Sequence, residues 1–305
     1  MHHRLAQLLA LAVASHITTS SASPLDVRAT AVKCNDVTTG LDPNCWSQLN
    51  MTTWFKNWEA NTPGANSAQG SASTEDPVDP PANPAQPQTS PGVAGGFGNG
   101  GDIGYRRRAV GCQKGEKWST CFLRLGLGKA GEDCTKIGPQ TCVPPQVGKP
   151  PQSPEVYYGL WNIYAVNNYI TTVYDALQDL ARSNPDTIRS IATGSGDATV
   201  DFSNGKTYDV NGVLVEILLK ETNGRQLINA INTPLITYLE NAKSKNKYGP
   251  TTGVDQLTSW MSYSLTDALK YVMTDLPAFV KFVDNGAFST KALPKKADLV
   301  KAFAA

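Results

Sequence analysis

The feature that most constrains the fold of this 305-residue chain is a set of apolar residues that recurs every three or four positions near its middle. This spacing places the apolar side chains on one face of an α-helix of about seven turns. Ser153 is a candidate N-cap, Pro154 suits the first helical position, and Asn184-Pro185 is expected to end the helix. The apolar positions are Val156, Leu160, Ile163, Ile170, Val173, Leu177 and Leu180.

Four more segments after this helix show helical patterning: about 209–222, 225–245, 254–283 with a break near Pro277, and 295–304. A short helix begun by Asn50 or Thr52 is expected near the N-terminus, and an Asn-Gly turn within 202–207 suggests a small hairpin. The predicted fold class is mainly α. It consists of a C-terminal helical bundle, preceded by a small loop-rich disulfide module and a disordered linker.

The first 22 residues have the parts of a secretory signal peptide. His2, His3 and Arg4 precede an apolar stretch over 5–13, and small residues end at Ala22. A membrane anchor is the alternative, but the apolar stretch is shorter than the roughly 18 to 20 residues that span a bilayer. The predicted organisation is a signal peptide (1–22), a short Cys-containing segment (23–58), a Pro/Gly-rich linker (59–110), a disulfide-rich module (111–152) and a helical domain (153–305).

Six cysteines follow the predicted signal. An even number in an exported chain indicates three disulfides, although fifteen pairings are possible. A metal cluster is the alternative, but the sequence contains no C-x-x-C pair. The cysteines are Cys34, Cys45, Cys112, Cys121, Cys134 and Cys142.

The histidines exclude several kinds of catalysis. The three of them, His2, His3 and His16, lie in the predicted signal, so the mature chain would have none. Nucleophile activation by Ser-His-Asp or Cys-His and imidazole-based zinc sites are therefore excluded. The net charge of +1 predicts no nucleic-acid partner, and no motif implies a cofactor.

The linker composition is dominated by Pro, Ala, Gln and Asp over 76–91 and by Gly over 92–104. It ends in a basic run in which Arg107 and Arg108 are either a processing-protease site or a solvated charge cluster. Before it, Asn50-Met51-Thr52 is an N-glycosylation sequon, which predicts an exposed loop or helix start. Within the disulfide module, 122–125 is a possible short strand.

Several patterns are compatible with a ligand or catalytic site. Gly126–Gly131 matches G-x-G-x-x-G but lacks the strand and helix of a dinucleotide site, so a glycine-rich turn is the favoured interpretation. Glu216 is either a buried catalytic carboxylate or half of a surface pair with Lys220. Asp175 and Asp179 are either paired catalytic carboxylates or a solvated helix face.

The first helix of the C-terminal domain is rich in aromatic residues. Aromatic stripes at helical spacing are usually core, whereas exposed rings stack on sugars or partner surfaces. If one face is exposed, Trp161 and Tyr158 are the candidate ligand-binding residues.

Four segments of the chain resemble a block found in uncharacterised secreted fungal proteins and in the C-terminal regions of large chitinase-like chains. They are STCFLRL (119–125), DCTKI (133–137), TCVPP (141–145) and PEVYYGLWNIYAVN (154–167), and the resemblance extends over roughly 34–58 and 112–180. The chitinase signature D-x-x-D-x-D-x-E is absent. The resemblance implies a fungal source and an extracellular or cell-wall location, and it implies no catalytic residue.

Three functional hypotheses follow. The first is a secreted, non-catalytic protein that binds an extracellular protein or polysaccharide at the cell wall, in a host or against a competitor. The second is a carboxylate-based glycoside hydrolase acting on wall polysaccharide. The third is a processed two-chain toxin, which requires Cys34 or Cys45 to pair with one of the four later cysteines.

Overall fold

In a computed structural model, the described residues of the chain form ten helices. All ten helices belong to one compact unit, Val32–Ala305. No strand occurs among the described residues, so the predicted mainly α class is confirmed. Over 220–222 and 226–232 the backbone is described without the side chains. The described residues are 34, 42, 44–65, 111–127, 133–138, 142–145, 153–194, 208–222, 226–242, 253–284 and 294–304.

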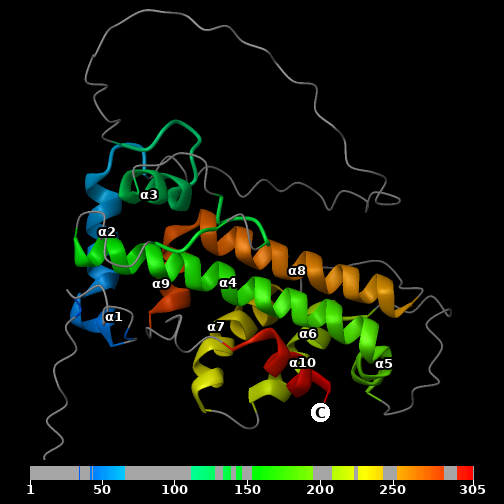
Figure 1. The fold of residues 1–305 in the computed structure, drawn as a ribbon. Helices are drawn as coiled ribbons and strands as arrows, with labels where there is room; N and C mark the ends of the chain where they lie inside the picture. Colours follow the sequence, from blue (N-terminus) through cyan, green and yellow to red (C-terminus); the bar gives the residue numbers. More distant parts are fainter. Residues whose placement is uncertain are drawn as a thin grey trace, which may run out of the picture. The chain divides into compact units, whose positions relative to one another are not determined.

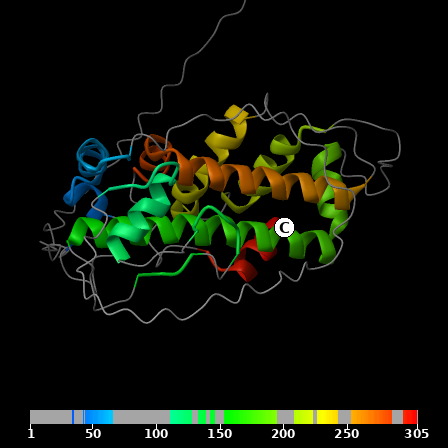
Figure 2. The same cartoon turned by 90° about the horizontal axis from the view of Figure 1, so that it is seen from above.

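Two long helices, α4 (Pro154–Ser183) and α8 (Val254–Thr274), lie side by side and form the centre of the fold (Figures 1 and 2). The start of α4 is as predicted: the Ser153 side chain accepts a hydrogen bond from the Val156 backbone amide, and Pro154 occupies the first turn. Asn184 ends the helix. All but one of the apolar positions predicted for α4 are fully buried, and the exception, Val156, is partly exposed.

Helices α5 (Pro185–Thr193), α6 (Val210–Thr222), α7 (Gln226–Ala242) and α10 (Lys296–Ala304) pack around this pair. Helix α10 contacts both α4 and α6 through Leu299 and Phe303, which are fully buried. The prediction placed only a stop at Asn184-Pro185. Pro185 also begins α5, because proline suits the first turn of a helix as well as it ends the previous one.

The break predicted near Pro277 separates α8 from α9 (Leu276–Val283). Asp275 has an extended backbone, and its side chain accepts a hydrogen bond from the Ala278 amide at 2.8 Å. This capping interaction starts α9 directly after α8 ends. Helix α9 contacts α2 and α7, and Figure 1 shows it near both.

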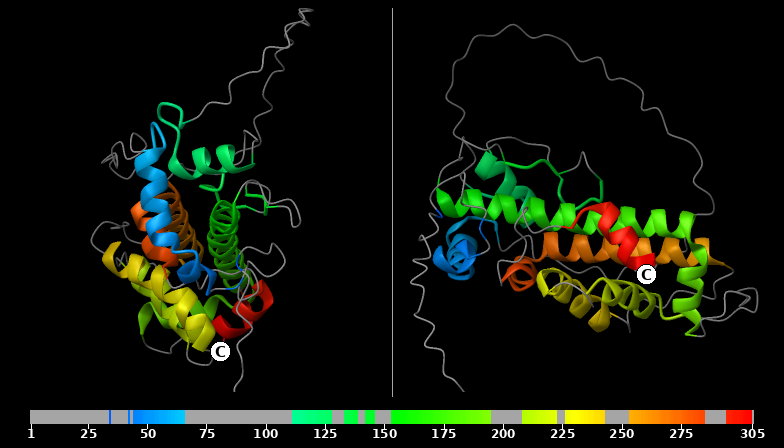
Figure 3. Two further views of the ribbon diagram at one scale, coloured as in Figure 1. Left: turned by 90° about the vertical axis from the view of Figure 1, so that its left-hand side faces the viewer. Right: turned by 60° about the horizontal axis from the view of Figure 1, so that its bottom comes forward.

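Three short helices, α1 (Cys45–Gln48), α2 (Met51–Asn61) and α3 (Trp118–Leu127), lie near the N-terminal end of α4 (Figure 3). Helix α2 confirms the predicted N-terminal helix, with Asn50 at the N-cap position. The Ser119 hydroxyl of α3 donates to the Met273 carbonyl of α8 at 2.7 Å, a buried contact that joins α3 to the bundle.

Two predictions are corrected here. The possible strand over 122–125 is part of α3, because Phe122 and Leu123 both face the core from a helix. Residues 59–65, assigned to the linker by composition, belong to the fold: α2 continues to Asn61, and Ala65 is buried. The rest of the predicted linker and the hairpin within 202–207 lie outside the described residues.

Candidate functional site

The six cysteines form the three predicted disulfides, and each disulfide joins two cysteines that are consecutive among the six. The pairs are Cys34–Cys45, Cys112–Cys121 and Cys134–Cys142. The two-chain toxin required a disulfide between the first two cysteines and the later four, and this pairing contradicts that requirement. A cut after Arg107 or Arg108, which lie outside the described residues, would leave no covalent link between the two pieces.

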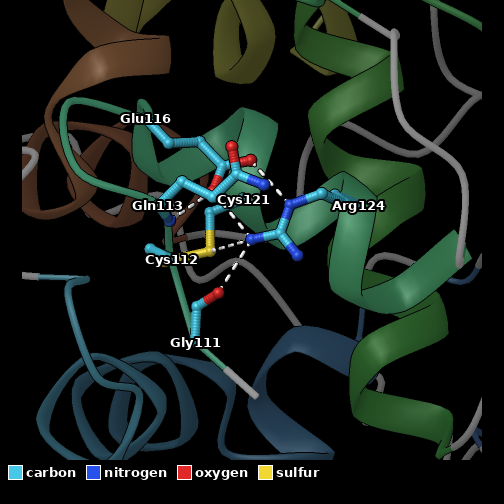
Figure 4. The surroundings of a disulfide bond; sticks show 6 residues. All are labelled: Gly111, Cys112, Gln113, Glu116, Cys121 and Arg124. Atoms are coloured by element: carbon cyan, nitrogen blue, oxygen red, sulfur yellow. Dashed lines mark hydrogen bonds and ion pairs between the residues drawn. A yellow bond between two sulfur atoms is a disulfide. The ribbon is translucent and has the colours of Figure 1, made fainter. Parts of the chain in front are cut away.

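A half-buried polar cluster surrounds the Cys112–Cys121 disulfide (Figure 4). Arg124 makes two hydrogen bonds to the Glu116 carboxylate, at 2.7 and 2.8 Å, and a third to the Gly111 carbonyl at 2.8 Å. These bonds from Arg124 are the main cause that lowers the pKa of Glu116.

Cys112, Glu116 and Cys121 also bring two sulfurs and a carboxylate within the spacing of a metal site. The sulfurs are bonded to each other, and the Glu116 oxygens accept hydrogen bonds from Arg124 and from the Gln113 backbone. Metal-binding sulfur is a thiolate, which a disulfide does not provide. The cluster is therefore structural, and it fixes the loop before α3 to α3 itself.

The glycine-rich sequence 126–131 starts at the end of a helix. Gly126 is buried in α3, where an added Cβ would lie 3.2 Å from side-chain atoms of Val156 and Leu160. A dinucleotide site needs the glycines to follow a strand and precede a helix. Gly126 instead permits close packing of α3 on α4. The expected glycine-rich turn does not begin at Gly126, and residues 128–131 lie outside the described residues.

The candidate ligand-binding aromatics are mostly part of the core. Tyr158 is 2% exposed, and its hydroxyl donates to the Asp42 carbonyl at 3.1 Å. Burial raises its pKa to about 12. Trp161 is half-buried between the rings of Tyr157 and Tyr164. Tyr158 therefore offers no ring face to a ligand, and the prediction that it binds one is wrong.

The candidate catalytic carboxylates do not face one another across a cavity. Glu216 is exposed on α6, and the side chain of its expected partner Lys220 lies outside the described structure. Asp179 accepts a hydrogen bond from Lys296 at 2.8 Å and lies 3.7 Å from Arg182, while Asp175 is exposed. The solvated-face interpretation of Asp175 and Asp179 fits this arrangement.

A hollow lined by residues of α7, α8 and α9 is the larger of two described here, and we call it the tyrosine groove. Its volume is about 410 Å³, within the range of small-ligand sites. Tyr238 of α7 stacks on Tyr271 of α8, with ring centroids 5.2 Å apart and planes at 28°. The lining residues are Thr233, Pro234, Thr237, Tyr238, Asn241, Ala242, Tyr271, Val272, Ala278, Lys281 and Phe282.

The polar groups of the tyrosine groove lie around an apolar centre. Lys281 provides its one cation, and no carboxylate is among the described residues that line it. The Asn241 amide donates to the Thr237 carbonyl within α7 at 2.8 Å, which leaves the Asn241 oxygen as an acceptor. Partial burial raises the pKa of Tyr271, and the nearby charge of Asp275 adds to this effect. Its hydroxyl therefore stays protonated and able to donate across the physiological range.

A second, smaller hollow of about 260 Å³ lies between α2 and α9. Lys281 lines both hollows, which are otherwise lined by different residues of α9. Glu59 and Asp284 are the carboxylates of this second hollow. Burial raises the pKa of Glu59, and the charge of Asp275 raises it further.

Sequence reasoning did not find the tyrosine groove. Tyr238 and Tyr271 lie on different helices, and neither belongs to a short motif. The sequence offered one weak signal, which is that Tyr271 falls outside the apolar stripe of α8. In the structure Tyr271 is 46% exposed.

Comparisons with protein-family models, with curated proteins and with solved structures found no significant match. Among the described residues, no helix has both the length and the apolar character needed to cross a membrane. The functional argument therefore rests on the groove and on the chemistry of its residues.

Proposed function

We propose that this chain is a secreted, non-catalytic binding protein whose ligand occupies the tyrosine groove. The observation that carries the proposal is the stacked Tyr238–Tyr271 pair, because a stacked pair of tyrosines at the surface keeps apolar area exposed to water. A concave site with an apolar centre and a few convergent polar groups is the usual form of a small-ligand site.

The ligand class that best fits this groove is a neutral polysaccharide segment. Sugar rings have an apolar C–H face that packs on an aromatic ring, and hydroxyls that need donors and acceptors around it. Tyr271 provides the ring, while Asn241 and Lys281 provide an acceptor and a donor at the groove. The lack of a carboxylate among its described lining residues gives no attraction for a cationic ligand.

The proposed location is the fungal extracellular space or cell wall. The three disulfides support an oxidising compartment. The segments that resemble secreted fungal proteins also contact one another: the Asn167 amide donates to the Cys134 and Lys136 carbonyls, at 2.9 and 2.8 Å. We infer that the resemblance is one of shared packing, which is consistent with its lack of catalytic residues.

The test is calorimetric titration of the full chain with soluble β-glucan and chitin hexasaccharides, together with pull-down on the insoluble polymers. Tyr271→Ala removes the stacking ring and should weaken binding about five- to tenfold, since aromatic packing contributes about 1 kcal/mol. Tyr263→Ala is the matched control: Tyr263 is 47% exposed on the same helix and lies outside the groove.

Binding that Tyr271→Ala weakens and Tyr263→Ala leaves unchanged would support the proposal. Equal effects of the two substitutions, or no binding to any of the polymers, would overturn it. A protein ligand would instead give pull-down of neither polymer and a defined complex with an extracellular protein, which contradicts the polysaccharide assignment.

Glycoside hydrolysis is the second candidate, and the raised pKa of Glu59 favours it. A general acid needs a carboxyl group that keeps its proton near working pH, and Asp284 provides a second carboxylate in the same hollow. Release of shorter sugars from the same hexasaccharides, abolished in Glu59→Gln, would establish this activity. Unchanged oligosaccharide length after prolonged incubation would exclude it for these substrates.

A further inference from the structure

We propose that Asn50 carries an N-linked oligosaccharide and that it is attached before α9 closes against α2. The proposal rests on the export of the chain stated above. It concerns a different part of the molecule from the tyrosine groove, so each can fail without the other.

The Asn50 side chain is placed to carry a glycan. Asn50 is exposed in the left-handed turn between α1 and α2, with φ 48°. Its side chain makes no capping hydrogen bond to the helix that follows. An N-cap asparagine normally uses its side-chain oxygen to satisfy a backbone amide of the first turn. Because this bond is not made, the exposed Asn50 side chain is accessible for the attachment of a sugar.

The remainder of the sequon is engaged by the fold. Met51 is fully buried. The Thr52 hydroxyl donates to the Asp284 carboxylate at 2.7 Å and accepts from the Trp46 indole at 3.1 Å. The same indole also reaches Asp284, at 3.3 Å. We call this set of contacts the Thr52 latch, and it joins α2 to the residue directly after α9.

A glycosyltransferase must bind the acceptor sequence in an extended form and recognise the threonine hydroxyl. In the folded chain, Met51 begins a helix and the Thr52 hydroxyl is already hydrogen-bonded on both sides. The folded sequon is therefore a poor acceptor, although the Asn50 side chain is exposed. Transfer must take place while this part of the chain is still extended.

The order of synthesis provides the interval for transfer. Asp284 follows Thr52 by 232 residues. At about 5 to 20 residues per second, the latch cannot form for roughly 10 to 50 s after Thr52 is made. In the transfer, the Asn50 amide nitrogen attacks the anomeric carbon of a polyprenyl-pyrophosphate-linked oligosaccharide. The carbon–oxygen bond to phosphate breaks, the lipid pyrophosphate leaves with the electron pair, and one amide proton is lost to a base.

Thr52 then has two successive roles. Its hydroxyl is first part of the acceptor sequence and afterwards part of the latch. Thr52→Ser keeps the hydroxyl and should preserve both roles, whereas Thr52→Val has the same shape and should lose both. Asn50→Gln should lose the glycan and keep the latch. Asp284→Asn should keep full glycan occupancy, because the modification precedes the contact that this substitution weakens.

The first experiment expresses the full chain and these variants in a eukaryotic secretory host and measures intact mass with and without enzymatic removal of N-glycans. We expect one glycan on the wild type, Thr52→Ser and Asp284→Asn, and none on Asn50→Gln or Thr52→Val. Both Thr52→Val and Asn50→Gln lack the glycan, so the latch is the difference between them. The denaturation midpoint should therefore be lower for Thr52→Val, which loses the latch. A secreted wild-type chain without a glycan would overturn the proposal.

The second experiment tests the timing and does not depend on secretion. Unglycosylated, oxidised chain is incubated with purified oligosaccharyltransferase and a lipid-linked oligosaccharide, in parallel with chain that has been reduced and unfolded. We expect modification of the unfolded chain at least tenfold faster. Equal rates would overturn the timing. A chain that stays in the cell, yet shows this difference in vitro, would contradict the proposed location and leave the acceptor assignment supported.

Discussion

The two halves of α4 are packed by different kinds of side chain. Around its first half lie α1, α2, α3 and α9, a region that we call the aromatic end. There Phe55 contacts the rings of Trp118, Phe122 and Phe279, with centroids 5.4 to 6.2 Å apart. Gly159 of α4 permits this packing, because an added Cβ would lie 2.9 Å from the Phe122 ring.

The second half of α4 packs mainly through aliphatic residues. It contacts α5, α8 and α10, and we call this region, with α6, the aliphatic end. Its fully buried residues include Val173, Leu177, Leu180, Leu214 and Leu265. The three disulfides belong to the elements of the aromatic end and the loops around them, and none occurs among the described residues of the aliphatic end.

Both ends contain short helices, and they differ in what holds these helices in place: α5 and α10 of the aliphatic end have 9 residues each and carry no disulfide among the described residues. Helices α1, α2 and α3 have 4, 11 and 10 residues, which is too short for stable helices in isolation. They depend on large aromatic contacts and on covalent links. Helices α4 and α8 have 30 and 21 residues and bury long apolar stripes against each other. We therefore expect the two ends to lose structure separately.

The largest expected effect is that of Phe55→Ala. The substitution leaves a cavity at the centre of the aromatic cluster and should lower the free energy of unfolding by about 3 to 5 kcal/mol. Denaturant titration gives the total, and hydrogen exchange shows where protection is lost. We expect faster exchange in α2 and α3, with α10 little changed.

Leu177→Ala is the matched substitution at the aliphatic end and should cost about 2 to 5 kcal/mol. It should raise exchange in α10 and α8 while α2 keeps its protection. If both substitutions raise exchange equally throughout the chain, the two ends form one cooperative unit, and the comparison above is wrong.

Replacing the Cys112–Cys121 disulfide by two serines should have the next largest effect. The two cysteines are 9 residues apart in sequence, and a loop of this size gives about 2 to 3 kcal/mol of stabilisation in the chain-entropy description. Proteolysis should then begin near α3. First cleavage within α5 or α6 would contradict the assignment of this stability to the aromatic end.

The same difference explains what the sequence could predict. Long amphipathic helices such as α4 were predictable because each apolar position repeats many times. The possible strand over 122–125 is part of α3 and was not predicted as a helix, because four residues are too few to reveal a helical period and the burial of Phe122 and Leu123 depends on the fold. The even number of cysteines predicted three disulfides, whereas their pairing required the fold.

The tyrosine groove was unpredictable for a related reason. Local patterns report on residues of one element, whereas Tyr238 and Tyr271 meet only when α7 packs on α8. The candidate pair Tyr158 and Trp161 came from one helix and was chosen by residue type alone. Which aromatic residues of α4 are exposed depends on the short helices that cover its first half, such as α1 with Trp46.

The ion pair between Arg124 and Glu116 gives the aromatic end a distinct pH dependence. Its side chains are 15% and 10% exposed, so Glu116→Gln should cost about 2 kcal/mol at neutral pH. Because folding lowers the pKa of Glu116, this stability is present above the unfolded value near 4.5 and is lost as the pH falls through the folded pKa.

Denaturant titrations from pH 7 to pH 2 test this prediction. The difference between wild type and Glu116→Gln should shrink as the pH decreases below about 4.5. Asp179→Asn is the control from the aliphatic end: its partner Lys296 is on the surface, so the pH dependence should follow that of the wild type. A difference that grows at low pH would contradict the assigned sign.

The smallest effect, and the sharpest test of close packing at the aromatic end, is that of Gly159→Ala. Alanine favours a helix by about 1 kcal/mol over glycine, whereas overpacking costs about 1 to 3 kcal/mol. The Phe122 and Phe55 rings lie within 3.1 Å of the new Cβ and are fixed by their neighbours, so we expect a net loss near 1 kcal/mol.

Gly212→Ala in α6 is the counterpart at the aliphatic end. Its new Cβ would meet the Asp209 carboxylate at 2.7 Å. Moving this exposed side chain weakens the hydrogen bond that it accepts from the Gly212 amide, and the higher helix propensity of alanine offsets this loss, so the change should stay within about 0.5 kcal/mol. Thermal denaturation of the two variants compares them directly. If Gly159→Ala is as stable as Gly212→Ala, the rings around α4 can shift like a surface side chain, and the aromatic end owes its stability to its disulfides and not to the fit of its rings.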